Sequence, residues 1–173
     1  MSHLLQAASL LALTAAATLA SAAEPEQLRA VAVMRDAAGR QVGTATLAQD
    51  EAGVRIAIGL KGLPPGRHGF HLHAAARCEG PDFASAGTHF NPGKKAHGPT
   101  GTADAHAGDL PDLVADGEGF AMTGFIARGV TLAPGPNSLL GGAGTALVVV
   151  SGPDDGKAGP DGARLVCGVV TRR

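Results

Sequence analysis

The chain has 173 residues, of which 26 are glycine and 11 are proline, and it carries a formal net charge of −1 with no tryptophan or tyrosine. So much glycine and proline argues against a helical bundle, because both residues destabilise helix interiors. Balanced charge and few aromatic side chains argue against nucleic-acid binding, which needs basic surfaces and stacking platforms. Hydrophobic residues make up 45% of the chain, which is too many for a disordered protein, and the length suits one domain.

The first 22 residues have the pattern of a secretory signal peptide. Residues 4–20 are uncharged and mostly apolar, and Ala20-Ser21-Ala22 supplies the small residues of a cleavage site. The alternatives are an alanine-rich helix of the mature protein and a membrane anchor, for which the stretch is short. We expect export to the periplasm or the medium, cleavage after Ala22, and a mature domain over residues 23–173 without a membrane span.

Short apolar or alternating segments separated by turns predict an all-β mature domain. In residues 54–60 the apolar side chains occupy every second position, which is the period of a half-buried strand. Strands are predicted over residues 28–34, 41–47, 54–60, 68–73, 119–126, 144–150 and 164–170. Regularly spaced short strands are typical of a β-sandwich or barrel. Residues 74–111 follow no sustained period, and a loop of that length needs something to hold it.

Two cysteines, Cys78 and Cys167, lie far apart in the sequence. An exported protein meets an oxidising compartment, where an even pair of cysteines favours a disulfide. Such a bridge would close a loop over most of the mature domain, which the chain-entropy model values at roughly 4 to 5 kcal/mol. Two buried free thiols are the alternative.

The histidines are concentrated in one part of the chain, because six of the seven lie between His68 and His106. His71 and His73 are two residues apart on a predicted strand, so their side chains point to the same face. Two imidazoles on one face can converge on one metal ion, and imidazole suits copper and zinc.

A second set of metal-binding side chains, His97, His106 and Asp109, lies in the long loop. Two imidazoles and a carboxylate suit zinc, which needs one further ligand for a closed tetrahedron. His89 lies between the two sets in the sequence and is available to either. The alternative for the whole cluster is a group of solvated loop histidines, but the density of histidines favours metal binding.

Four segments together resemble the copper/zinc superoxide dismutase family. They are Gly69-Phe70-His71-Leu72-His73, Gly87-Thr88-His89-Phe90-Asn91-Pro92, His97 with His106-Ala107-Gly108-Asp109-Leu110, and Cys167-Gly168-Val169. The resemblance spans essentially the whole mature chain. It implies an eight-stranded Greek-key β-barrel of sandwich-like architecture with long metal-binding loops. It also implies an oxidoreductase that converts the superoxide anion to oxygen and hydrogen peroxide.

The resemblance implies a role for each residue of the cluster. The copper ligands would be His71, His73 and His89. The zinc ligands would be His89, which bridges the two metals, together with His97, His106 and Asp109. Cys78 and Cys167 match the family disulfide, and His68 matches a structural histidine behind the site.

Two further residues match family positions next to the metals. Arg164 matches the arginine that guides superoxide, since a cation at the mouth of a site raises the encounter rate of a small anion. Asp154 matches the carboxylate that accepts hydrogen bonds from a copper-ligand and a zinc-ligand histidine and orients both rings.

One copper-ligand position departs from the family pattern. The family has a fourth copper-binding histidine at the end of a strand, and the register to Asp154 puts Val150 in its place. Two functions follow as alternatives. The chain is an exported superoxide dismutase with a three-histidine copper site, or a non-catalytic, zinc-stabilised relative that binds, stores or delivers copper. A third reading is a structural domain that kept only zinc.

Overall fold

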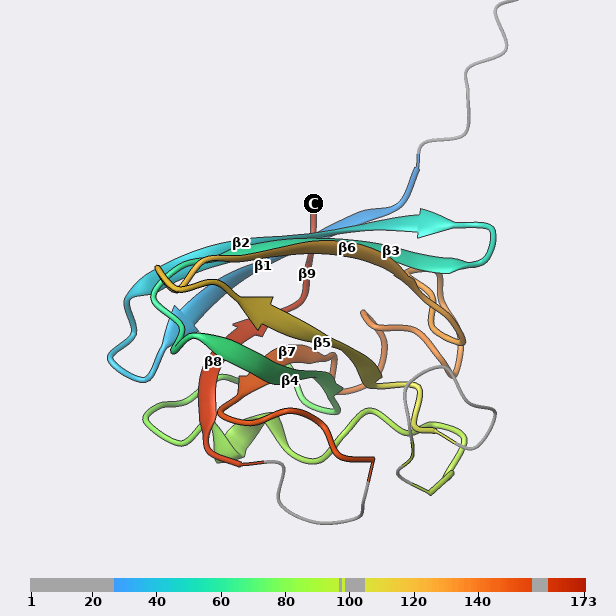
Figure 1. Ribbon diagram of the computed structural model, residues 1–173. Helices are drawn as coiled ribbons and strands as arrows, with labels where there is room; N and C mark the ends of the chain where they lie inside the picture. Colours follow the sequence, from blue (N-terminus) through green and yellow to red (C-terminus); the bar gives the residue numbers. More distant parts are fainter. Residues whose placement is uncertain (1–26, 97, 99–104, 157–161) are drawn as a thin grey trace, which may run out of the picture.

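The computed structural model describes residues 27–96, 98, 105–156 and 162–173. These residues contain nine antiparallel strands (Figure 1). They are β1 (Arg29–Asp36), β2 (Gln41–Asp50), β3 (Gly53–Leu60), β4 (Gly66–His73), β5 (Asp109–Ala115), β6 (Ala121–Ala127), β7 (Ala146–Val150), β8 (Arg164–Val169) and β9 (Thr171–Arg172). In the described part of the β4–β5 connection, Ala84–Ala86 form a 3-10 turn. No helix in the described ranges is long and apolar enough to cross a membrane.

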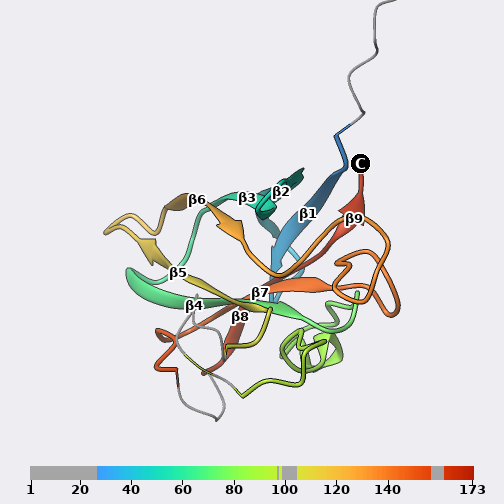
Figure 2. The same cartoon turned by 90° about the vertical axis from the view of Figure 1, so that its right-hand side faces the viewer.

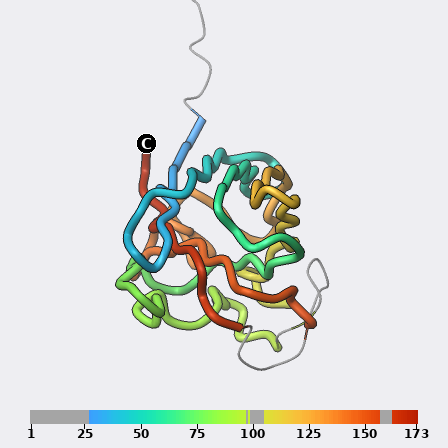
Figure 3. Tube along the Cα trace, turned by 60° about the vertical axis from the view of Figure 1, so that its left-hand side comes forward, coloured from blue at the N-terminus to red at the C-terminus, as the bar shows by residue number. Residues whose placement is uncertain are grey.

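The strands form one sheet that curls into a nearly closed barrel. Its order is β5-β4-β7-β8-β1-β2-β3-β6, and β9 pairs with β1. The two end strands, β5 and β6, follow each other in the chain and lie side by side where the barrel closes (Figure 2). The pairing of β9 with β1 brings the first and last strands together (Figure 3). The predicted all-β, eight-stranded barrel is confirmed, with β9 as a short addition.

The predicted strands are all present, and the alternation in β3 has the expected consequence. Val54 and Ile56 are fully buried in the barrel interior, whereas Arg55 between them is exposed. Two strands are not predicted by the sequence pattern, β5 and β9. Residues 109–111, which the pattern assigns to the long loop, are the beginning of β5. Pro111 breaks the strand pattern there, and the fold tolerates a proline because β5 is an edge strand.

Strand β4 differs from β3 because both of its faces are buried. Phe70 and Leu72 point into the barrel core, and each is 0% exposed. The opposite face carries His71 and His73, which are also buried, at 0% and 2% exposed. The connection between β4 and β5, drawn from green to yellow in Figure 1, runs beneath β4, β7 and β8 and covers this outer face.

A disulfide between Cys78 and Cys167 ties this connection to β8, as predicted. The two Cα atoms are 5.6 Å apart, and the residues are separated by 89 positions in the sequence. Around the bridge, Phe83, Ala86 and Val148 form a small buried cluster outside the barrel core. The covalent bond therefore holds the loop against the face that carries the histidines.

Reduction of the disulfide is expected to lower the thermal midpoint of unfolding by about 10 °C. Releasing the loop restores conformational entropy to the unfolded chain, worth roughly 4 to 5 kcal/mol, and each kcal/mol shifts the midpoint of a domain of this size by about 2–4 °C. Scanning calorimetry with and without reductant measures the shift. The Cys78→Ala/Cys167→Ala variant is the control, because its midpoint should be low and insensitive to reductant. An equal midpoint for oxidised and reduced protein would contradict this prediction.

Candidate metal centre

Three imidazoles converge beneath β4. His71 and His73 come from the outer face of that strand, and His89 comes from the loop that covers it. A β-bridge between His73 and His89 holds this part of the loop, and the Phe90 N–H donates to the Leu72 carbonyl at 2.8 Å. The ligand atoms that the three histidines offer all lie within 4.8 Å of one another. The structure therefore brings ligand atoms of His71 and His73 close to one of His89.

A second group of ligand atoms shares His89 with the first. Asp109, the first residue of β5, places its Oδ1 2.8 Å from Nδ1 of His89 and 3.2 Å from Nδ1 of His106. The main-chain N–H of His106 donates to the other oxygen of Asp109 at 2.9 Å, which fixes the carboxylate. Two imidazoles and one carboxylate are a donor set that zinc prefers. The remaining predicted member, His97, lies outside the described residues.

The hydrogen-bond partners determine which ring nitrogen of each β4 histidine can bind a metal. Nε2 of His71 lies 3.3 Å from Oδ2 of Asp154, and Nδ1 of His73 lies 2.8 Å from the Gly87 carbonyl. A carboxylate and a carbonyl can only accept, so each of these nitrogens carries a hydrogen. The lone pairs available for a metal are therefore on Nδ1 of His71 and on Nε2 of His73.

The second nitrogen of His73 provides a test of whether a metal fits. His73 Nε2 is buried and has no hydrogen-bond partner among the described residues. A buried polar atom in this state is destabilising unless something binds it. A metal ion bound to the lone pair of His73 Nε2 would satisfy the atom, and imidazole is a suitable ligand for copper. The residues present therefore fit a metal at this place.

Burial keeps His73 in the form that binds metals. Burial is the main cause that lowers the pKa of His73 from 6.5 to about 3, and the neighbouring His89, Arg164 and His71 contribute to the same shift. The hydrogen bond to the Gly87 carbonyl raises the pKa of His73, but by less than burial lowers it. His73 is therefore neutral at physiological pH, as a metal ligand must be.

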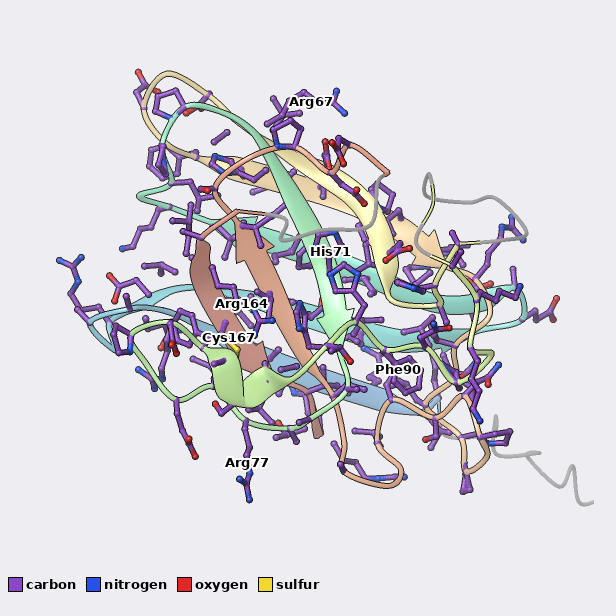
Figure 4. All side chains as sticks on the ribbon, turned by 90° about the horizontal axis from the view of Figure 1, so that it is seen from below. Arg67, His71, Arg77, Phe90, Arg164 and Cys167 are labelled. Atoms are coloured by element: carbon purple, nitrogen blue, oxygen red, sulfur yellow. A yellow bond between two sulfur atoms is a disulfide. The ribbon has the colours of Figure 1, made fainter. Side chains whose placement is uncertain are left out.

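Arg164 is fixed near His73 by main-chain oxygens of the covering loop. It lies at the start of β8, three residues before Cys167, and it is half-buried (Figure 4). Its guanidinium donates to the Phe83 carbonyl at 2.7 Å and to the Gly87 carbonyl at 2.8 Å. The Gly87 carbonyl thus accepts from both Arg164 and His73. Sequence reasoning does not find Gly87, because its contribution comes from the main chain.

Val150 lies next to His71 at the end of β7. The side chains of the two residues pack over Gly69, where an added Cβ would be 2.8 Å from Cγ2 of Val150 and 3.0 Å from Cε1 of His71. Val150 is 2% exposed, and it belongs to the apolar cluster around the disulfide. A well-packed isopropyl group, which offers no electron pair to a metal, therefore occupies the space beside His71.

Comparisons with known proteins point to one family. The family described as Copper/zinc superoxide dismutase (SODC) matches residues 41–170. The chain is 41% identical over 157 residues to "Superoxide dismutase [Cu-Zn] 2" of Aquifex aeolicus, and the aligned region covers 88% of this chain and 92% of that protein. It is 37% identical over 147 residues to "Superoxide dismutase [Cu-Zn]" of Caulobacter vibrioides, with 82% and 84% covered. Among solved structures, a SOD-like protein from Bacillus subtilis superposes with a TM-score of 0.76 at 32% identity, covering 82% of this chain and 97% of that one.

Acidification of the metal-free protein is expected to destabilise it through His73. The pKa of this group is about 3 in the folded protein against 6.5 for an unperturbed histidine. Between these values the unfolded chain binds a proton that the folded protein excludes, so the free energy of unfolding falls as pH falls below 6.5. One such group contributes a slope approaching about 1.4 kcal/mol per pH unit.

Urea unfolding in the presence of a chelator, at several pH values between about 5 and 7, measures this slope above the range in which carboxylates titrate. His73→Gln removes the group, and the slope of its unfolding free energy against pH should be smaller by up to about 1.4 kcal/mol per pH unit. Equal slopes for the two proteins would contradict the assignment.

Proposed function

The chain belongs to the copper/zinc superoxide dismutase family of oxidoreductases, and from this premise we propose that it is an exported metalloprotein with a complete zinc site and an incomplete copper site. Residues 1–22 act as the signal peptide, and residues 23–173 form the mature domain in the periplasm or the medium. When copper is bound, the protein dismutates superoxide to oxygen and hydrogen peroxide. The observation that carries the proposal is the pair of ligand groups that share His89.

The zinc site consists of His89, His97, His106 and Asp109. Three of these offer ligand atoms within 4.8 Å of one another, and the family pattern supplies His97 as the fourth. Four ligands of this kind complete the closed tetrahedron of a structural zinc site. Zinc at this position joins the β4–β5 connection to β5 and stabilises the loop that carries His89.

The copper site consists of Nδ1 of His71, Nε2 of His73 and the nitrogen of His89 that does not face Asp109. Copper supplies a one-electron carrier that alternates between two oxidation states. Val150 stands where the family has a fourth ligand, so this site has three nitrogen donors, and copper is bound less tightly than by four.

The chain's own residues bind and orient the substrate and the ligands. Arg164 presents a fixed positive charge near His73, and this charge attracts the superoxide anion and holds it near the centre. The Gly87 carbonyl keeps the hydrogen of His73 on Nδ1, and Asp154 keeps that of His71 on Nε2. These contacts leave the lone pairs of both rings aimed at the same place.

A second candidate function is copper binding without dismutation. The observation that favours it is the packing of Val150, whose buried side chain fills the space beside His71 with an apolar group. A protein of this kind keeps the zinc-stabilised barrel and stores copper or delivers it to a partner. The two functions differ in whether the copper-loaded protein consumes superoxide.

We expect the purified mature protein to retain about one equivalent of zinc after extended dialysis and to lose most of its copper, because four ligands hold zinc and three hold copper. Mass-spectrometric metal analysis measures both metals. His106→Gln is the matched variant, since it removes a ligand of the zinc group only, and it should reduce zinc retention. Copper retained at one equivalent by the wild-type protein would contradict this prediction.

Val150→His is expected to raise copper affinity at least about tenfold and to raise dismutase activity with it, because it supplies a fourth nitrogen donor beside His71. A superoxide assay and a copper-chelator competition measure the two effects. Val150→Ala is the control, because it removes the apolar group without adding a donor and should leave both values low. If the wild-type protein with added copper already equals Val150→His in the assay, Val150 is not the defect. An inactive copper-loaded wild type and an active Val150→His would favour copper binding as the native function.

A further inference from the structure

A β-bulge between β4 and β5 lies at Gly69, two residues before His71. His68 pairs with Leu113 and Phe70 pairs with Leu110, so Gly69 alone faces the two residues Pro111 and Asp112. A bulge of this kind interrupts the ladder and redirects side chains, and bulges are common beside functional sites. At the bulge, Gly69 and Asp112 form hydrogen bonds with the loop that follows β7.

Two hydrogen bonds connect the bulge to that loop. The N–H of Gly69 donates to the Gly152 carbonyl at 2.6 Å, and Oδ1 of Asp112 accepts from the main-chain N–H of Asp154 at 3.2 Å. Oδ2 of Asp112 accepts from Nε and Nη2 of Arg67 at 3.2 and 3.0 Å. The side chain of Asp112 is only 6% exposed, whereas that of Arg67 is 67% exposed. A buried carboxylate is thus held from outside by a surface arginine and holds Asp154 on its inner side.

The carboxylate of Asp154 connects this loop to His71 of the first ligand group. Its Oδ1 accepts from the N–H of Gly156 at 2.8 Å, and its Oδ2 lies 3.3 Å from Nε2 of His71. The side chain of Asp154 is 6% exposed, so water competes little for these bonds. The direction of the carboxylate depends on where the main chain of Asp154 lies. Figure 4 shows the two ends of this series, Arg67 near the rim of the molecule and His71 near its centre.

We propose that Asp112, held by Arg67, is a positioning residue for His71. It fixes the main chain of Asp154, so the Asp154 carboxylate keeps the hydrogen of His71 on Nε2 and the metal-binding lone pair on Nδ1. This inference rests on the proposed function, in which His71 is a copper ligand. The Arg67–Asp112 ion pair contributes little to stability, because Arg67 is largely exposed. Its effect is to keep one oxygen of Asp112 directed at Asp154.

The test compares a variant that loses the acceptor with one that keeps it. Asp112→Leu has a similar size but accepts no hydrogen bond. In Arg67→Gln/Asp112→Asn the amide oxygen still accepts from Asp154, and no guanidinium competes for it. Long-range 15N NMR on the metal-free protein measures the tautomer of His71. Competition between Cu²⁺ and a chelator measures copper affinity, and metal analysis measures zinc retention.

We expect Asp112→Leu to give a mixture of His71 tautomers and to bind copper about 10- to 100-fold less tightly. The double variant should keep the Nε2–H tautomer and bind copper within about threefold of wild type. Asp36→Leu is the matched control, because Asp36 also accepts hydrogen bonds from the main chain and pairs with an arginine, but at the β1–β2 turn. It should change neither the tautomer nor the copper affinity.

Failure of this inference is distinguishable from failure of the proposed function. If the wild-type protein binds no Cu²⁺, the proposed function fails, and the tautomer measurement still tests the role of Asp112. If Asp112→Leu keeps a single Nε2–H tautomer, the inference is overturned, even where zinc retention or thermal stability falls. Should Asp112→Leu not fold, Arg67→Gln alone changes only an exposed side chain. It should then weaken Cu²⁺ binding several-fold, and an unchanged affinity would overturn the role of the pair.

Discussion

The arrangement of the metal centre depends on the burial of both faces of β4. One face packs Phe70 and Leu72 into the barrel core, which fixes the strand, and the other holds His71 and His73 beneath the β4–β5 connection. Alternation along a strand then places the two imidazoles side by side without any further device. Burial is also the main reason that the pKa of His73 falls to about 3, which keeps the ring neutral. A histidine pair on a half-exposed strand would share the spacing but not this environment.

The covering loop selects the tautomer of His73 as well as excluding water. The carbonyl of Gly87 accepts from both His73 and Arg164, so one main-chain oxygen positions a proposed copper ligand and the proposed substrate-guiding cation. That oxygen is held in place from two sides, by the Cys78–Cys167 disulfide and by the bridge between His73 and His89. The disulfide therefore acts on the centre through the position of a carbonyl, although no sulfur atom belongs to either ligand group.

Local pattern was enough to predict most of the strands and the convergence of His71 with His73, because alternation and i, i+2 spacing are properties of single segments. It was not enough for β5, where Pro111 and Asp112 interrupt the alternation and the bulge opposite Gly69 places them. Local pattern also does not predict that Val150 and His71 both lie over Gly69, since the two residues belong to strands that are far apart in the sequence. Resemblance to a family supplied the ligand roles of Asp109 and His97, which spacing alone left open, and His97 lies outside the described residues.

The proposed loss of a copper ligand at residue 150 concerns a side chain alone, because the main chain there is held independently of it. Nδ1 of His68 lies 2.9 Å from the Val150 carbonyl, and its Nε2 lies 2.7 Å from the Pro64 carbonyl, so the end of β7 is tied to the turn before β4. Two residues after the end of β7, the Gly152 carbonyl accepts a hydrogen bond from the N–H of Gly69. None of these contacts uses the isopropyl group. The main chain that would present a ligand at this position is therefore held in place around an apolar side chain, and the Asp154 carboxylate lies four residues later. A substitution at residue 150 alone should thus report the effect of that side chain on copper binding.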